Sequence, residues 1–150
     1  MKVAEANLKK ALLLAPEYAS AHMNFGAVLI HTNRALQGIA ECERALELDR
    51  NLGTAHAMIG LGKSYIGRGE ETEAHIKEAL RLSPRETFAH MWIASAGLVK
   101  IYLGRDEDAV VLLRRAIEIN QSFPLAHFFL AASLAHLNRV NDAERPPSHG

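Results

Sequence analysis

The strongest constraint on the fold is an internal repeat with a period of about 34 residues. Three short patterns return along the chain in the same order. An Ala-Leu or Ala-Ile pair starts at Ala11, Ala45, Ala79 and Ala116, with spacings of 34, 34 and 37 residues. An Ala-His pair starts at Ala21, Ala55, Ala89 and Ala126, and a turn-like pair ending in arginine starts at Asn33, Gly67, Gly104 and Asn138. Series that stay in phase predict a repeat protein whose units stack on their neighbours.

Each period contains the pattern of two helices. Apolar residues recur at helical spacing, for example at Ile39, Cys42 and Leu46. Glycine or asparagine in the turn-like pairs suits the residue that ends a helix, and Pro16 and Pro84 fall where a following helix begins. No segment shows sustained strict alternation of apolar and polar residues. The sequence therefore predicts an all-α fold of about eight helices arranged as antiparallel pairs.

These units resemble tetratricopeptide repeats (TPRs). The small residue of the first helix in that family corresponds to Gly26, Gly60, Ala94 and Ala131, and the large apolar residue before it to Phe25, Ile59, Ile93 and Leu130. The resemblance runs from about Val3 to Ala143 and implies a right-handed α-solenoid, the TPR superhelix. Segments such as 41–51 are also similar to the C-terminal TPR arrays of bacterial adenylate/guanylate cyclase-type signalling proteins. The cyclase catalytic segment is absent, so its activity is not expected.

The expected organisation is one array over residues 1–145 and a disordered tail at 146–150. It consists of the second helix of a partial unit, full units at roughly 19–52, 53–86 and 87–123, and a truncated last unit. Residues 139–145 are expected to begin a second helix that Pro146 and Pro147 end. Three extra residues between Ala94 and Ile101 are expected to lengthen the first helix of the third unit (about 86–103) by a turn, or to form a bulge.

Composition excludes several classes of partner. Lysine plus arginine and aspartate plus glutamate both number 17, so the basic excess of a general nucleic-acid binder is missing. No apolar stretch reaches the roughly 18 residues of a membrane span, so no membrane partner is expected. The single cysteine cannot form an internal disulfide, which favours a reducing compartment and a cytoplasmic location.

No residue pattern indicates catalysis, so the chain is not expected to be an enzyme or to bind a cofactor. Four of the eight histidines are placed alike in successive units: His22, His56, His90 and His127. Neighbouring helices pack roughly 10 Å apart, whereas zinc ligands lie about 2 Å from the ion, so packing is favoured over a metal site. These histidines could still make stability depend on pH. Cys42 takes the place of Ile76 and Leu113 in later units, which predicts a buried apolar residue.

The resemblance implies that the first helices line a concave, apolar groove. We expect this chain to be a non-catalytic scaffold that binds a peptide or helix of another protein there. The lysine and asparagine clamp of chaperone-binding relatives is missing, and some groove residues could instead pack between helices. The predicted groove residues are Met23, Asn24, Ala27, Thr54, Met58, Leu61, Tyr65, Phe88, Met91, Trp92, Phe128 and Phe129.

An alternative function involves the two ends of the array, which lack clear polar caps. Leu8 and Leu12 at one end, with Phe129 and Leu130 at the other, are candidates for self-association into a homo-oligomer. On this alternative, the chain is a self-assembly or regulatory segment of a cyclase-type signalling protein.

Overall fold

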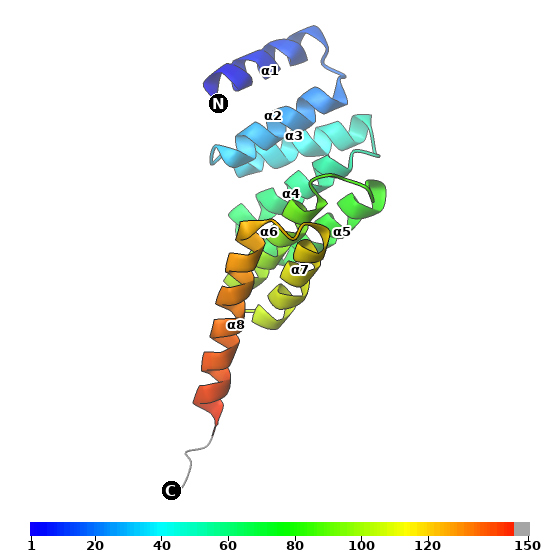
Figure 1. Cartoon of the computed structure of the whole chain (residues 1–150). Coiled ribbons are helices and arrows are strands. Elements are labelled where there is room, and N and C mark those ends of the chain that lie inside the picture. The colour runs from blue at the N-terminus through cyan, green and yellow to red at the C-terminus, as the bar shows by residue number, and fades with distance from the viewer. Residues whose placement is uncertain (146–150) are drawn as a thin grey trace, which may run out of the picture. The chain divides into compact units, whose positions relative to one another are not determined.

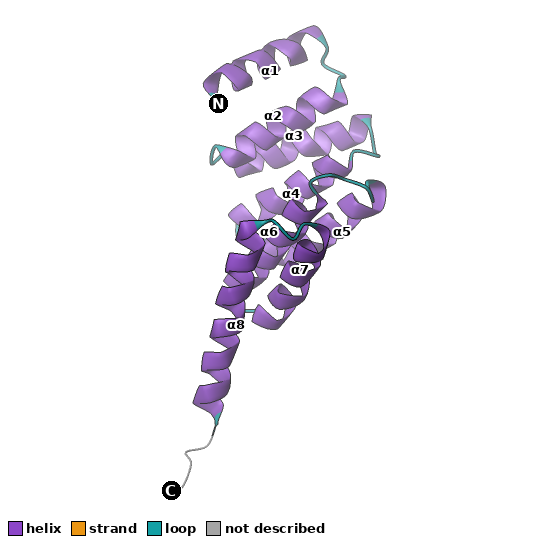
Figure 2. Ribbon diagram, viewed as in Figure 1, coloured by secondary structure: helices purple, strands orange, loops and turns teal. Residues whose placement is uncertain are grey.

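The computed structural model of the protein describes residues 1–145, which form helices joined by short loops (Figures 1 and 2). No strand occurs within these residues, and the predicted all-α fold class is confirmed. A short 3-10 helix, η1 (Gly69–Glu71), precedes the fifth α-helix. The α-helices are α1 (Lys2–Leu14), α2 (Ala19–His31), α3 (Ala35–Leu48), α4 (Gly53–Tyr65), α5 (Thr72–Leu82), α6 (Ala89–Tyr102), α7 (Asp106–Ile119) and α8 (Pro124–Glu144). The tail predicted at 146–150 lies outside the described residues.

The helices fall into two compact units that divide after Thr87. In the first unit α2 pairs with α3 and α4 with α5, while α1 packs on α2 and α3 packs on α4. In the second unit α6 pairs with α7, and α8 packs on α7 and, less extensively, on α6. In the order of the repeat, we call α2, α4, α6 and α8 first helices, and α1, α3, α5 and α7 second helices.

Three sharp turns reverse the chain between a first helix and its second helix. Their central residues, Asn33, Gly67 and Gly104, have φ values of 66°, 81° and 72°. Glycine adopts this left-handed conformation without a Cβ clash, and asparagine tolerates it better than most residues. Each turn is closed by a backbone hydrogen bond across the helix end, such as Arg68 N–H to Lys63 O at 2.8 Å. These three turns match the sequence prediction.

The fourth predicted turn, at Asn138, does not form, and α8 continues to Glu144. The prediction of a second helix over 139–145 is therefore wrong. A helix folded back over these seven residues would bury only small patches of apolar surface, because Val140 and Ala143 are its apolar side chains. Continuing the helix keeps the backbone hydrogen bonds and avoids the cost of a left-handed asparagine.

Paired helices cross closely where the first helix carries glycine. A Cβ atom on Gly26 would lie 2.5 Å from Cys42 Sγ and 2.7 Å from the carbonyl oxygen of Gly38 on α3. Gly60 leaves similar room for Thr72, whose hydroxyl donates a 2.8 Å hydrogen bond to the Gly60 carbonyl. In the second unit Gly97 of α6 occupies the equivalent position in the contact with α7. A Cβ atom there would lie 2.9 Å from the Leu113 side chain.

The three extra residues of the third period do not lengthen its first helix by a turn. Helix α6 has 14 residues and α4 has 13, whereas the connection at 83–88 is longer than the one at 49–52. The insertion therefore lies mostly in this loop, where added length costs little entropy. When Gly97 is aligned with Gly60, Trp92 corresponds to Ala55 and Ala94 corresponds to Ala57. The predicted match of Ala94 to Gly26 is therefore wrong.

The first unit has a core of Ile30, Ile39, Cys42, Ala55 and Ile59. Cys42 is fully buried, as predicted. Burial raises the pKa of its thiol to about 12, with the neighbouring carboxylates adding to the shift. A thiol held in its protonated form is a poor nucleophile, so Cys42 has a packing role. Among the described residues, no helix combines the length and apolarity needed to cross a lipid bilayer.

Candidate binding surface

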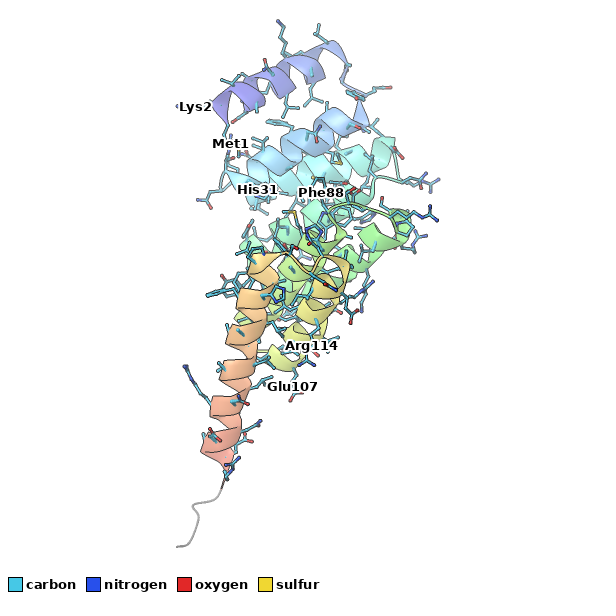
Figure 3. All side chains as sticks on the ribbon, viewed as in Figure 1. Met1, Lys2, His31, Phe88, Glu107 and Arg114 are labelled. Atoms are coloured by element: carbon cyan, nitrogen blue, oxygen red, sulfur yellow. The ribbon has the colours of Figure 1, made fainter. Side chains whose placement is uncertain are left out.

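Charged side chains are concentrated on the second helices. Each of α1, α3, α5 and α7 carries between four and six Asp, Glu, Lys or Arg residues, such as Glu107 and Arg114 of α7 (Figure 3). Helix α2 carries none, α4 only Lys63, α6 only Lys100, and α8 none before Arg139. Lys63 is bonded to Glu71 at 2.9 Å. The surface of the first helices is therefore almost free of charge.

The aromatic residues show the opposite distribution. All nine lie on a first helix or at the residue that immediately precedes it, and none lies on a second helix. Five of them are more than half exposed: Tyr18, Tyr65, Phe88, Tyr102 and Phe128. Aromatic side chains bury large areas at protein interfaces and are enriched among the residues that dominate binding. The sequence contained this signal, but it becomes visible only once the helix boundaries are known.

In the first unit, α2 and α4 contact each other and carry seven of the predicted groove residues. Met23 and Met58 are half-buried and pack against the core, so the alternative of packing between helices applies to both. Asn24 and Tyr65 are exposed, with Tyr65 59% accessible. The remaining three are half-buried: Ala27, Thr54 and Leu61.

In the second unit, the loop insertion changes which residues face outward. Phe88 precedes α6 and is exposed, while Trp92 is only 7% accessible and offers little surface to a ligand. Met91 takes the place of Thr54 and is 45% accessible. On α8, Phe128 is 67% accessible, and its ring meets that of Phe129 edge to face at 5.5 Å.

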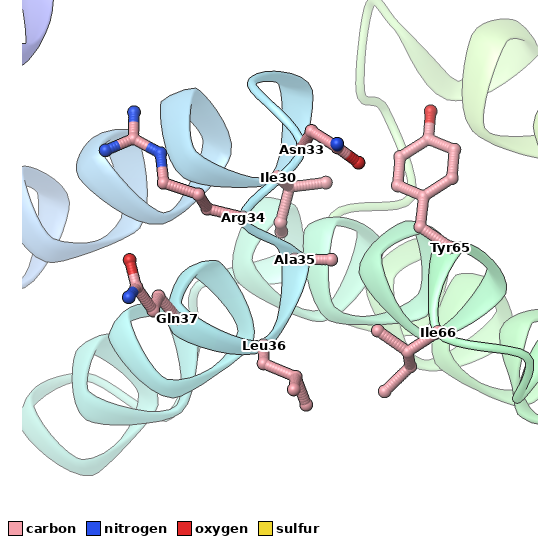
Figure 4. A pocket seen from close by; sticks show the side chains of 8 residues that line it. All are labelled: Ile30, Asn33, Arg34, Ala35, Leu36, Gln37, Tyr65 and Ile66. Atoms are coloured by element: carbon pink, nitrogen blue, oxygen red, sulfur yellow. The ribbon is translucent and has the colours of Figure 1, made fainter.

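A hollow of about 300 Å³ lies in the first unit where the turn after α2 meets the end of α4 (Figure 4). Ile30, Leu36, Tyr65 and Ile66 give it apolar walls. Arg34 also lines it, but its guanidinium is committed to Glu5 on α1 through bonds of 2.9 and 2.7 Å.

The hydrogen bonds from Arg34, together with that from Lys9 at 3.1 Å, lower the pKa of the Glu5 carboxyl to about 2. The Arg34 charge is thus balanced at neutral pH, and the hollow suits an uncharged apolar group. Its size is at the lower end of small-molecule sites, which fits one side chain of a peptide better than a whole cofactor.

Two of the repeated histidines fasten the loop that precedes their helix. His22 Nε2 lies 2.7 Å from the Pro16 carbonyl oxygen, and its Nδ1 lies 2.7 Å from a Glu41 carboxylate oxygen. His127 Nε2 lies 2.8 Å from the Gln121 carbonyl oxygen. Both contacts reach back six residues, so the repeated side chain holds the loop against the start of the first helix.

The other two histidines of the series have different surroundings. His90 lies three residues out of register and contacts Asn120, at 3.2 Å, and the ring of Phe123. His56 Nδ1 is buried with no hydrogen-bond partner within residues 1–145, and its ring lies 6.1 Å from that of His75. No group of three or more metal-ligating side chains occurs in the described part of the chain.

One trio in the second unit has the residue types of a hydrolase triad. Asp106 Oδ2 lies 2.6 Å from His136 Nδ1, and Ser133 lies one turn before His136 on α8. The Ser133 side chain is fully buried, and its hydroxyl has no partner among residues 1–145. A nucleophile must contact its base and reach substrate, and Ser133 does neither. The contact between Asp106 and His136 instead ties α8 to the start of α7.

The residues predicted for self-association lie on α1 and α8, the first and last helices of the described residues. Leu8 and Leu12 of α1 are half-buried, as are Phe129 and Leu130 of α8. Helix α1 has no buried residue, and Leu13 beside them is 84% accessible. On α8 only Ala126 and Ser133 are buried. Both helices thus have apolar side chains that the described residues leave uncovered.

The chain matches no protein-family model and no curated protein, but it resembles several solved structures. YrrB, described as a TPR protein with an unusual peptide-binding site, is 26% identical, with a TM-score of 0.71 over 91% of this chain and 69% of YrrB. The thermophilic TPR protein TTC0263 from Thermus thermophilus is 18% identical, with a TM-score of 0.73 over 87% of this chain and 71% of its own. PilF from Pseudomonas aeruginosa is 20% identical, with a TM-score of 0.79 over 92% of this chain and 62% of its own. The helix pairs of this chain therefore have the fold of tetratricopeptide-repeat proteins.

Proposed function

We propose that this chain is a non-catalytic protein-interaction scaffold that binds an apolar or amphipathic peptide segment along its first helices. The observation that carries the proposal is the segregation of side chains. All nine aromatic residues belong to the first helices or their starts, and most helical charges belong to the second helices, those on α8 lying only from Arg139 onward.

Core packing explains part of this segregation but not all of it. Trp92 is buried, and Met23 and Met58 pack on the core. Tyr65 and Phe128, in contrast, expose more than half of their surface. Large apolar side chains gathered on one kind of helix mark interaction sites in soluble proteins.

The chemistry of the surface favours an uncharged ligand face. A peptide carboxylate or a phosphate needs arginine or lysine donors, and the lysines of α4 and α6 are 14% accessible (Lys63) and buried (Lys100). An amphipathic helix or an apolar peptide needs none of them. YrrB, which has a similar fold, is described as having a peptide-binding site, and this supports a peptide as the ligand.

A test is selection of binders from a random peptide library against the whole chain, followed by calorimetry of the selected peptides. Tyr65→Asp in the first unit and Met91→Asp in the second alter exposed side chains, so both variants should fold. We expect at least one of them to weaken binding by about tenfold or more, because truncating an interface anchor costs about 2 kcal/mol.

Val111→Asp is the matched control, since Val111 is 68% accessible on the second helix α7. It should leave the affinity unchanged. Peptides that bind all three variants equally, or a library that yields no binder, would contradict the proposal.

Two finer predictions from the sequence stay predictions: the cytoplasmic location and the relation to cyclase-type signalling proteins. The structural relatives reported above support a TPR scaffold and give no support to a cyclase context.

A further inference from the structure

Each second helix has a stripe of three residues along one face. This stripe is buried in α3, α5 and α7 but left uncovered in α1. In α3 the stripe consists of Gly38, Cys42 and Ala45, all buried against the paired first helix. The same places are buried in α5 (Thr72, Ile76 and Ala79) and in α7 (Ala109, Leu113 and Ala116). The corresponding residues of α1 are Ala4, Leu8 and Ala11. None of the three is buried, and Ala4 is exposed.

Helix α8 is a first helix whose surface for a paired second helix is uncovered. The small residue that contacts the paired second helix is Gly26 in α2, Gly60 in α4 and Gly97 in α6. In α8 it is Ala131, which is exposed. One turn further along, Leu134 is 36% accessible, whereas Leu29 in the same place of α2 is 3% accessible.

A third uncovered position on α8 extends the same surface. Phe128 takes the place of Met23 in α2, which is half-buried against the core, and of Ala57 in α4 and Ala94 in α6, which are 1% and 5% accessible. Phe128 itself is 67% accessible. A residue that the other first helices bury wholly or in part is thus replaced by a large exposed aromatic one, which is the type of residue that anchors an interface.

We propose that α1 of a second copy of this chain packs on α8 as α3 packs on α2, so that copies associate head to tail. Each helix supplies the surface that the other lacks a partner for. Helix α8 has an uncovered Phe-x2-Ala-x2-Leu stripe where a first helix contacts its second helix, and α1 has the uncovered Ala-x3-Leu-x2-Ala stripe of a second helix. The α2–α3 pair is the pattern for this contact within the chain.

Ala131 carries a Cβ where α2, α4 and α6 have glycine, so α8 and the second α1 would cross slightly further apart than α2 and α3. The contact joins two different surfaces of the same chain. Such a heterologous contact does not close on itself as a two-fold dimer does, and it therefore allows growth with concentration. A symmetric α8–α8 contact would leave the α1 stripe uncovered.

The test uses Ala4→Arg and Ala131→Arg, which alter the exposed alanine of each stripe. Mass is measured by light scattering over a hundredfold range of concentration. The unmodified chain should exceed 16.5 kDa and grow with concentration. Each variant keeps one intact surface, so each alone should stay a monomer. An equimolar mixture of the two should give a one-to-one dimer of twice that mass and nothing larger.

Ala6→Arg is the control on α1, because Ala40, Ala74 and Val111 at the same place of the other second helices are all exposed. It should assemble like the unmodified chain. Helical circular dichroism of each variant checks its fold.

Several outcomes would overturn the proposal. If the unmodified chain is a monomer at every concentration, the two stripes do not recognise each other. If Ala4→Arg alone still dimerises, the contact is symmetric through α8. If Ala131→Arg alone still dimerises, the contact is symmetric through α1. Tyr65 and Met91, which test peptide binding, lie outside both stripes, so either proposal can fail without the other.

Discussion

The close crossing of α2 and α3 makes Gly26→Ala an informative substitution. The new methyl group would lie 2.5 Å from Cys42 Sγ and 2.7 Å from the Gly38 carbonyl oxygen, and the second of these is a backbone atom. Because the backbone cannot move aside without shifting α3, the two helices must separate. Overpacking of this kind costs about 1–3 kcal/mol, and the upper half of that range applies where backbone is in the way.

Gly62→Ala is the matched comparison, because Gly62 lies in a helix of the same unit. Its new methyl would meet only side-chain carbons, at 2.8 Å from Ile39 Cγ1 and 3.2 Å from Ile30 Cδ1. Both substitutions gain about 1 kcal/mol of helix propensity. We therefore expect Gly26→Ala to lose about 1–2 kcal/mol of unfolding free energy, and Gly62→Ala to change it by less than about 1 kcal/mol.

Urea unfolding followed by circular dichroism measures both variants. With a slope of about 2 kcal/mol per molar urea, Gly26→Ala should lower the midpoint by roughly 0.5–1 M, and Gly62→Ala should leave it nearly unchanged. Equal midpoints for the two variants would refute the argument that the α2–α3 crossing has no room for a Cβ.

Three further predictions concern titration and polar contacts. Burial and the charge of Lys63 lower the pKa of His75 in the folded protein, so the unfolded chain binds a proton at this residue more readily. Folding stability should therefore be lost as the pH falls through about 6.5. His75→Gln should flatten the pH dependence of the melting temperature. Cys42, with a pKa near 12, should react with a thiol reagent at pH 8 only at the rate of unfolding, so fast labelling of the native protein would contradict its burial. His136→Ala removes the partner of the buried Asp106 carboxylate and should cost about 1–3 kcal/mol in urea unfolding, while His136→Asn, which keeps a donor, should cost less.

The sequence was sufficient to predict the helix pairs, because the repeat series and the turn residues depend on local chemistry. Gly67 and Gly104 end a helix wherever they occur in this pattern, since they need no partner elsewhere. Asn138 has the same local pattern and remains helical. Whether a turn forms at Asn138 depends on whether residues 139–145 have enough apolar surface to pack back on the preceding helix. A local pattern contains no information about that packing.

The register of the second unit was predicted wrongly for a different reason. Ala89 and His90 look like another copy of the Ala-His pair, although they lie three residues out of the structural register. Aligning them with Ala55 and His56 led to the prediction that the three extra residues lie inside α6. The structure shows that the glycine contact with the second helix sets the register instead, through Gly97. As a result Trp92, which was predicted to line the groove, is buried, and Phe88 lies immediately before α6 instead of within it.

The polar contacts of the histidines could not be predicted either. His22 and His127 bond to carbonyl groups six residues earlier because the loop before each helix folds back on it. The contact between Asp106 and His136 joins residues that are 30 positions apart. Both require the three-dimensional path of the chain, which the repeat alone does not specify.

The most direct test of the proposed function is to map a selected peptide onto the chain by backbone amide NMR. We expect the amide signals of the first helices, including those around Leu61 and Tyr65 or around Met91, to shift in proportion to bound peptide. Signals from the charged outer faces of α3 and α7 should stay in place. Shifts confined to the second helices would contradict the central claim that the uncharged, aromatic surface of the first helices is the binding site.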